Sequence, residues 1–142
     1  MAVEQTRETL TRYIDELLSF GDFASYFTED VTVAFMGANR TVRGRDAART
    51  LITAVHQQAF RTAVNVTTVA CSDQQAMIEA RFLGTHIGEF EGVPATGRSV
   101  DVPYAVAYDV RGDSISALRL YLPLDLLMRQ IAGAEQSAVH TV

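Results

Sequence analysis

The stretch from Gly84 to Arg98, which reads GTHIGEFEGVPATGR, restricts the possible folds of this chain more than any other. It separates two runs of alternating apolar and polar residues, 76–83 and 99–110, and such alternation is typical of half-buried strands. Glycine inside a strand pattern marks a bulge, a sharp bend or a close approach of two backbones. Pro94 fixes its own φ, and Gly97 can adopt the positive φ that closes a turn. The stretch therefore predicts a long, bent connection between two strands of a curved sheet.

Strands with this alternating pattern occupy most of the second half of the chain. Short polar turns at 72–74 and 111–113 join neighbouring strands as hairpins. The four strands are expected at Thr62–Ala70, Gln75–Leu83, Ser99–Arg111 and Ser114–Leu122. Strands that follow one another in this way form an antiparallel meander.

Three amphipathic helices are predicted at 4–20, 46–59 and 124–132, from apolar residues at spacings of three and four. Gly21 ends the first of them. Helices followed by a meander form an α+β pattern in which the helices cover one face of the sheet. A sheet this long and bent wraps around the helices, and we expect it to leave a conical cavity of the kind in which ligands bind.

The segment between the first two long helices is predicted to hold a short helix and two strands. Asp22 can cap a helical turn over 23–27, and residues 28–30 end it. β-branched residues then predict a strand at Val31–Met36. A hairpin turn leads from it to a short strand at 41–43.

Length and composition limit the class of protein. The 142 residues correspond to one domain, 1–142, with an expected ordered core at about 4–133 and a loose tail at 134–142. A formal net charge of −5 argues against binding to nucleic acid, which needs a clustered basic face. Cys71 is the only cysteine, which excludes an internal disulfide and a thiolate metal cage. No signal peptide and no apolar run of ~18 residues is present, so we expect no membrane contact and a cytoplasmic location.

Two motifs carry a resemblance to a known family. Residues Phe82–Phe90, FLGTHIGEF, and Gly92–Arg98, GVPATGR, resemble the SnoaL-like polyketide cyclases of the nuclear transport factor 2-like superfamily. The likeness extends from about Phe27 to Ala132. It implies a cone-shaped α+β domain, with three to four helices packed on a strongly curved, mostly antiparallel sheet. It also implies a homodimer without cofactors, in which each subunit binds a small apolar polyketide-like substrate, often in the biosynthesis of antibiotics and other natural products.

The chain departs from this family at the positions that matter for chemistry. Family cyclases that close rings by aldol chemistry use an aspartate, a histidine and an asparagine on three strands. The matching positions here are Leu120, Val106 and Val33, which are all apolar. The resemblance therefore implies a cyclase that closes a ring mainly by fixing the conformation of its substrate, as in the pericyclic closure of a polyene.

Several side chains are candidates for this site. Candidate catalytic residues are His86, Tyr104 and Tyr108, because a histidine titrates near physiological pH and a phenol can donate a hydrogen bond to a carbonyl. Candidate substrate-binding residues are Val33, Phe35, Phe82, Val106, Leu118 and Leu120. All of these apolar residues could instead belong simply to the core, and His86 could bond a neighbouring strand or a dimer partner. Neither His56 nor His140 has the spacing of a metal site, so no metal is expected.

Two other functions remain open at this point. An epoxide hydrolase or isomerase on the same fold would use Asp101, Glu79 or Arg119. Glu79 and Arg81 lie two apart on the same face of one strand, however, and pairing with charges on neighbouring strands is the plainer interpretation of both. A non-catalytic protein that shields an apolar ligand would need no acid or base, and a fold alone does not decide between binding and catalysis.

Overall fold

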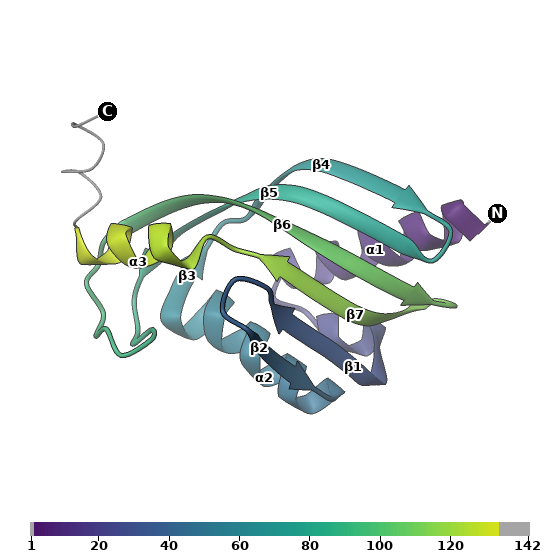
Figure 1. Cartoon of the computed structure of the whole chain (residues 1–142), viewed down its shortest axis with the longest axis horizontal. Helices are drawn as coiled ribbons and strands as arrows, with labels where there is room; N and C mark the ends of the chain where they lie inside the picture. Colours follow the sequence, from purple (N-terminus) through teal and green to yellow (C-terminus); the bar gives the residue numbers. More distant parts are fainter. Residues whose placement is uncertain (1, 134–142) are drawn as a thin grey trace.

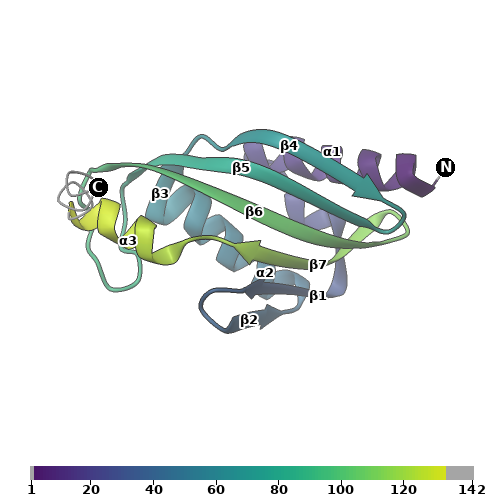
Figure 2. The ribbon, with the colours of Figure 1, turned by 45° about the horizontal axis from the view of Figure 1, so that its top comes forward.

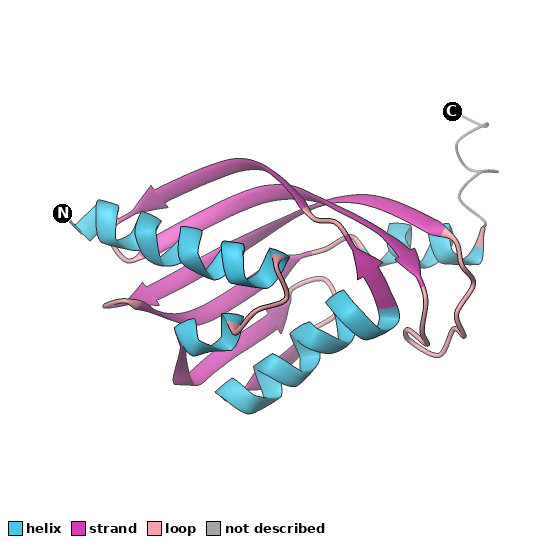
Figure 3. Ribbon diagram, turned by 180° about the vertical axis from the view of Figure 1, so that it is seen from behind, coloured by secondary structure: helices cyan, strands magenta, loops and turns pink. Residues whose placement is uncertain are grey.

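The structure, a computed structural model, describes residues 2–133, so the predicted loose tail at 134–142 and His140 lie outside the described residues. The described part is one strongly curled sheet with helices against its concave face (Figures 1 and 3). No helix among residues 2–133 is long and apolar enough to cross a membrane.

Seven strands form the sheet in the order β2-β1-β7-β6-β5-β3, and β4 also pairs with β5. Neighbouring strands are antiparallel except for β1 and β7, which are parallel, so the sheet is mixed. Figure 2 shows how far β5 and β6 bend along their length. The strands are β1 (Phe27–Phe35), β2 (Arg40–Arg43), β3 (Phe60–Thr62), β4 (Asn65–Ser72), β5 (Gln75–His86), β6 (Ser99–Arg111) and β7 (Ser114–Tyr121).

The predicted single strand at Thr62–Ala70 is wrong, because the chain breaks there into β3 and β4. Both strands pair with β5: β3 with its last residues, Gly84 to His86, and β4 with its first part. The sheet bends between the two, and the backbones come close at that point. A Cβ at Gly84 would lie 2.8 Å from the backbone oxygen of Arg61, so only glycine fits the pairing of β3 with β5.

The helices are α1 (Ala2–Leu18), α2 (Arg45–Thr53) and α3 (Leu124–Ala132), with a 3₁₀ turn, η1 (Phe23–Tyr26), after α1. The predicted helical turn therefore stops before Phe27, and residues 28–30, which were expected to end a helix, already belong to β1. A π-helix, η2 (Ala54–Ala59), continues α2. A π-turn inside or after an α-helix shifts the side chains that follow it and is frequent at functional sites.

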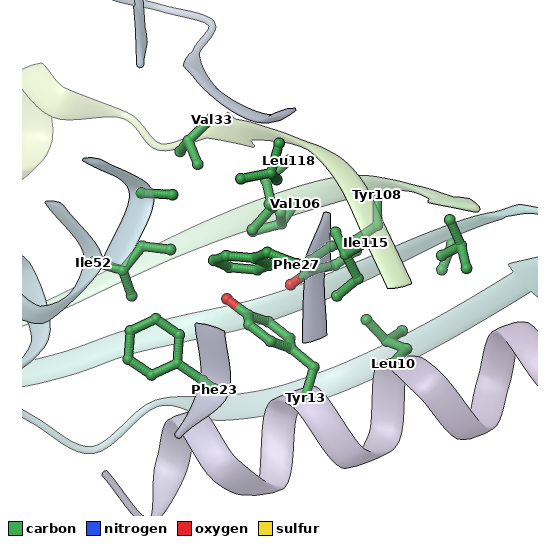
Figure 4. Packing of buried hydrophobic residues seen from close by; sticks show 14 of the residues in the cluster. Leu10, Tyr13, Phe23, Phe27, Val33, Ile52, Val106, Tyr108, Ile115 and Leu118 are labelled. Carbon is green, nitrogen blue, oxygen red and sulfur yellow. The ribbon is translucent and has the colours of Figure 1, made fainter. Parts of the chain in front are cut away.

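Two hydrophobic clusters fill the space between helices and sheet. The first lies under α1 and contains Leu10, Tyr13, Phe27 and Ile115, all at most 2% exposed (Figure 4). Burial of side chains of this size contributes about 1.5–3 kcal/mol each. The second lies under α3 and contains Phe60, Phe82, Val102, Leu127 and Ile131. The cavity described below lies where α2 and η2 pass over the sheet, between residues of both clusters.

Candidate functional site

A small apolar cavity lies between the sheet and the helical segment formed by α2 and η2. Its wall comes from β1, β5, β6, β7, α2, η2 and the loop after β5, and includes Val33, Phe35, Phe82, Phe90, Leu120 and Leu122. His56 and Tyr104 are the only lining residues whose side chains carry polar atoms. Its volume is about 40 Å³, which is room for a few water molecules. A ligand with a ring therefore needs part of this wall to move outward.

A second hollow, of about 230 Å³, lies on the other side of His56. The end of α1 contributes Leu17 and Leu18 to it, the turn after α1 contributes Phe20, and Thr62 on β3 also lines it. Leu18 and Phe20 are 42% and 50% exposed, so this hollow reaches the surface. Among the residues that line the two spaces, His56 alone belongs to both.

The proton on His56 can be placed from its hydrogen bond. Nδ1 lies 2.9 Å from the backbone oxygen of Ile52, one helical turn earlier. A carbonyl oxygen only accepts hydrogen bonds, so Nδ1 carries the proton and Nε2 of the neutral ring presents a lone pair. Burial lowers the pKa of His56, although the bond to Ile52 opposes this, so the ring is neutral at physiological pH. The ring packs edge-to-face on Phe82, with centroids 6.0 Å apart.

Tyr104 lies on β6 and also packs on Phe82. Its ring packs edge-to-face on Phe82 with a centroid distance of 6.1 Å. Burial raises the pKa of Tyr104 to about 12, so the phenol stays protonated and can donate a hydrogen bond. His56 and Tyr104 thus both pack on Phe82 and both line the cavity, whose surface is apolar.

The structure brings together five of the predicted site residues and leaves four, His86 among them, out of the cavity wall. Val33, Phe35, Phe82, Tyr104 and Leu120 line the cavity. Val106, Tyr108 and Leu118 instead belong to the first hydrophobic cluster. Tyr108 is 2% exposed, its ring lies 6.0 Å from that of Tyr13, and burial raises its pKa well above the ordinary value. Figure 4 shows Tyr13 and Tyr108 among the side chains that pack around Phe27.

His86 is fully buried at the end of β5 and does not line the cavity. Its Nδ1 accepts a hydrogen bond from the backbone N–H of Thr96 at 3.2 Å, and the Thr96 hydroxyl lies 3.0 Å from the same atom. The His86 backbone also bonds Gly97 and Arg98. No described residue bonds Nε2. The predicted catalytic candidate therefore holds the loop 87–98 against the end of the sheet.

The sequence motifs predict neither metal ligation nor catalysis at His56. The signal that could have identified it is its position four residues after Ile52, on the buried stripe of the predicted helix. A histidine on that stripe faces the sheet. No group of three or more histidine, cysteine, aspartate or glutamate side chains within residues 2–133 could hold a metal ion.

The charged residues of the epoxide-opening alternative lie on the outer face of the sheet. Arg81 on β5 pairs with Asp101 on the neighbouring strand β6 at 2.7 Å, which is the cross-strand pairing expected for it. Arg119 forms two hydrogen bonds of 3.1 Å with Asp109. Arg81 is exposed while its neighbour Phe82 is buried and lines the cavity, so the alternation of β5 turns this charge away from the site.

The loop after β5 covers one end of the cavity with Phe90. Glu91 and Gly92 have φ values of 49° and 85° and form a two-residue turn, in which the backbones of Phe90 and Val93 bond each other. Glu91 receives two hydrogen bonds of 3.1 Å from Arg40, at the start of β2. This pair ties the loop to the β1–β2 hairpin.

Comparison with known proteins agrees with this architecture. A family model for the SnoaL-like domain matches residues 10–118. The structure of a candidate SnoaL-like polyketide cyclase from Jannaschia sp. CCS1 is 28% identical, with a TM-score of 0.81 over 90% of this chain and 92% of that chain. A candidate polyketide cyclase from Xanthomonas campestris pv. campestris is 18% identical, with a TM-score of 0.82 over 92% and 99%.

A less similar structure has the same fold, but the protein is named for a different activity. A candidate ketosteroid isomerase from Kribbella flavida is 17% identical, with a TM-score of 0.67 over 85% of this chain and 79% of that chain. No curated protein matches the chain. The predicted α+β fold, with helices on a strongly curved sheet, is confirmed.

Proposed function

Because the chain belongs to the family of SnoaL-like domains, we propose that it is a cofactor-independent enzyme that closes a ring in a small, largely apolar, polyketide-like intermediate. The observation that carries this proposal is the cavity wall, in which only His56 and Tyr104 have polar side-chain atoms. The position of the family's aspartate is taken by Leu120, which lines this wall. A flexible apolar chain fits such a wall, and a strongly charged substrate does not.

The cavity supports ring closure through conformation and exclusion of water. A chain folded inside it has its reacting carbons held together, and such fixation is worth effective molarities of roughly 10⁵ M or more in favourable cases. The surface of the cavity is apolar, so the phenol of Tyr104 could donate a hydrogen bond to a substrate carbonyl only after the wall moves to expose its hydroxyl. A hydrogen bond of this kind is stronger in a site without water than at the surface.

The test is the variant Leu120→Trp, with Leu120→Met as a matched control that keeps the volume of the side chain. The chain contains no tryptophan, so the emission of the new indole reports directly whether it lies in an apolar space. We expect a folded protein with a blue-shifted emission that no longer binds 2-tetralone, a small apolar ketone, in ligand-observed NMR. Leu120→Met should bind it as the unchanged protein does. Equal binding of 2-tetralone by Leu120→Trp would contradict the proposed site.

A non-catalytic binding protein is the second candidate, and the observation that favours it is the lack of any carboxylate in the cavity wall. The binding protein and the cyclase are distinguished by what happens to candidate polyketide intermediates. A binding protein holds them unchanged over long incubation, whereas a cyclase converts them. NMR spectra recorded during the incubation separate the two, because ring closure changes the spectrum of the compound without changing its mass.

We also propose a homodimer that forms through the outer face of the sheet. Met77 and Tyr121 are 43% and 45% exposed, and Ala105 and Ala107 lie between them on this face. Light scattering should give twice the mass of one chain. A Met77→Glu substitution, which places a charge on this face, should lower that mass to one chain, with Met36→Glu on the exposed β1–β2 turn as control.

A further inference from the structure

Residues 89–95 form a flap over one end of the apolar cavity. Only Phe90 and Val93 in this flap are partly buried, and both pack against the second hydrophobic cluster; its other residues are exposed. Within residues 2–133, the hydrogen bonds that leave the flap all come from Arg40, which donates two to Glu91 at 3.1 Å. A segment with so little buried surface and so few outside bonds opens locally at low cost in free energy.

On each side of the flap the backbone is anchored. Before it, the N–H of Gly88 bonds the backbone oxygen of Ala59 at 3.0 Å. After it, the N–H of Thr96 bonds the buried ring of His86, and the N–H of Gly97 bonds the backbone oxygen of His86 at 2.9 Å. A motion that opens this end of the cavity is therefore confined to the flap.

The tip of the flap is a turn that holds its own shape. Phe90 and Val93 exchange two backbone hydrogen bonds, of 3.0 and 2.9 Å, around the positive φ values of Glu91 and Gly92. The Glu89 carboxylate accepts a further bond from the N–H of Gly92, at 2.6 Å. All of these bonds lie inside the flap, so the flap moves as one body and carries the ring of Phe90 with it.

The ring of Phe90 fills the end of the cavity that the flap covers. It lines the cavity and packs edge-to-face on Phe60, with ring centroids 5.1 Å apart. Phe60 is fully buried and does not belong to the cavity wall. Apart from Leu122, the other wall residues lie on strands or on α2 and η2, whose backbone groups are bonded in regular structure. The flap is therefore the part of the wall that moves outward most easily.

We propose that Phe90 is an internal plug, whose ring occupies the place that a flat conjugated group of the ligand takes. This inference rests on the proposed function and specifies its ligand class. The flap swings outward as the ligand enters, the bonds from Arg40 to Glu91 break, and the conjugated group replaces Phe90 against the ring of Phe60. A flat π-system can repeat the edge-to-face contact that Phe90 gives up, whereas a saturated group cannot.

The experiment measures binding of prodan, a fluorescent ketone with two fused aromatic rings, by stopped-flow fluorescence. We expect Phe90→Ala to lower Kd by about tenfold, because the ligand no longer has to displace the plug. Glu91→Gln should lower Kd by about twofold, because an exposed ion pair that holds the flap closed is lost. Both gains should lie in the association rate, since the flap is already open in the complex. In Phe90→Ala, the addition of Glu91→Gln should change nothing further.

A pair of competitors tests the ligand class. 2-Tetralone and 2-decalone have the same carbon skeleton, but only 2-tetralone contains an aromatic ring. In competition with prodan, 2-tetralone should bind to the unchanged protein at least about fivefold more tightly. Equal binding of the two ketones would overturn the proposed conjugated ligand.

Glu89→Gln and Ile87→Ala are the matched controls, and circular dichroism checks that each variant is folded. Within residues 2–133 Glu89 bonds only inside the flap, and Ile87 is 39% exposed and outside the cavity wall. Both should bind prodan as the unchanged protein does.

Unchanged Kd values in Phe90→Ala and Glu91→Gln would overturn the plug and leave the proposed cavity intact. Should Phe90→Ala fail to fold, the association rate of Glu91→Gln decides alone. Binding of 2-tetralone without binding of prodan would mean that the flap does not open, and would also overturn the inference. If the unchanged protein binds neither ketone, both this inference and the proposed function fail.

Discussion

The two described histidines lie on opposite sides of one aromatic pair and occupy very different surroundings. Phe60 and Phe82 pack edge-to-face at 5.3 Å; His56 packs on Phe82, and His86 packs on Phe60. His86 accepts two bonds from Thr96 and is sealed from solvent. His56 is tethered at Nδ1 alone and faces two hollows. The difference shows that a histidine in a conspicuous motif can serve the backbone, while an inconspicuous histidine on a helix lines the cavity.

The largest effect that tests this comparison is on stability. His86→Ala should lower the free energy of unfolding by about 3 kcal/mol, because it removes a fully buried ring and leaves the Thr96 N–H without its acceptor. His56→Ala should lower it by about 1 kcal/mol, because its half-buried ring borders space that is already empty. Urea unfolding followed by circular dichroism measures both. Equal losses would show that the two histidines are structural to the same degree.

A smaller effect is expected at the junction of the two regions. The N–H of Gly88 bonds the backbone oxygen of Ala59 at 3.0 Å, which joins the loop that His86 holds to the end of η2. A Cβ at Gly88 would collide with the backbone oxygen of Gln58. Gly88→Ala should therefore cost about 2 kcal/mol in the same unfolding assay. In Gly37→Ala the new Cβ meets nothing closer than 3.9 Å, and we expect a change below about 0.5 kcal/mol. An unchanged free energy of unfolding in Gly88→Ala would mean that the loop and the end of η2 are not tightly packed against each other.

A third prediction concerns the pH dependence of stability that the titration of His56 causes. Burial lowers its pKa in the folded chain, while the unfolded chain keeps the ordinary value of 6.5. As the pH falls below 6.5, the unfolded chain takes up the proton first, so stability is lost until the lowered pKa of the folded chain is passed. The loss should be at most about 1 kcal/mol, and it should vanish in His56→Gln. Urea unfolding at pH 7.5 and at pH 5.5 measures this loss of stability. If His56→Gln shows the same pH dependence, the loss belongs to another titratable group.

Much of the fold could be predicted because alternation and helical spacing are local properties of the sequence. The strands β5, β6 and β7 and the helices α1 and α3 lie close to their predicted bounds. The division into β3 and β4 could not be read in the same way. It arises because β5 is long enough to pair with two short strands, and the bend that separates them depends on contacts at Gly84 that lie far apart in sequence.

The site was predictable in part for the same reason. Strand alternation correctly placed Val33, Phe82 and Leu120 on the inner face, since side chains on a strand alternate between two faces. Alternation also puts Val106 and Leu118 on that face, but it does not say which positions along a strand lie beside a cavity and which lie under a helix. That depends on where α1 and α2 cross the sheet, which is decided by packing between distant segments.

The smallest effect concerns the pair that ties the loop to the β1–β2 hairpin. Arg40 and Glu91 are partly exposed, so Glu91→Gln should lower the free energy of unfolding by no more than about 0.5 kcal/mol at pH 7. The hydrogen bonds from Arg40 hold the pKa of Glu91 below its ordinary value of 4.5, so the contribution is complete above 4.5 and is lost as the pH falls through the lowered folded value. The difference between Glu91→Gln and the unchanged protein should therefore shrink as the pH falls below 4.5, and Glu29→Gln, at an exposed position, is the control. A loss well above 1 kcal/mol would mean that this pair, rather than His86, holds the loop against the sheet.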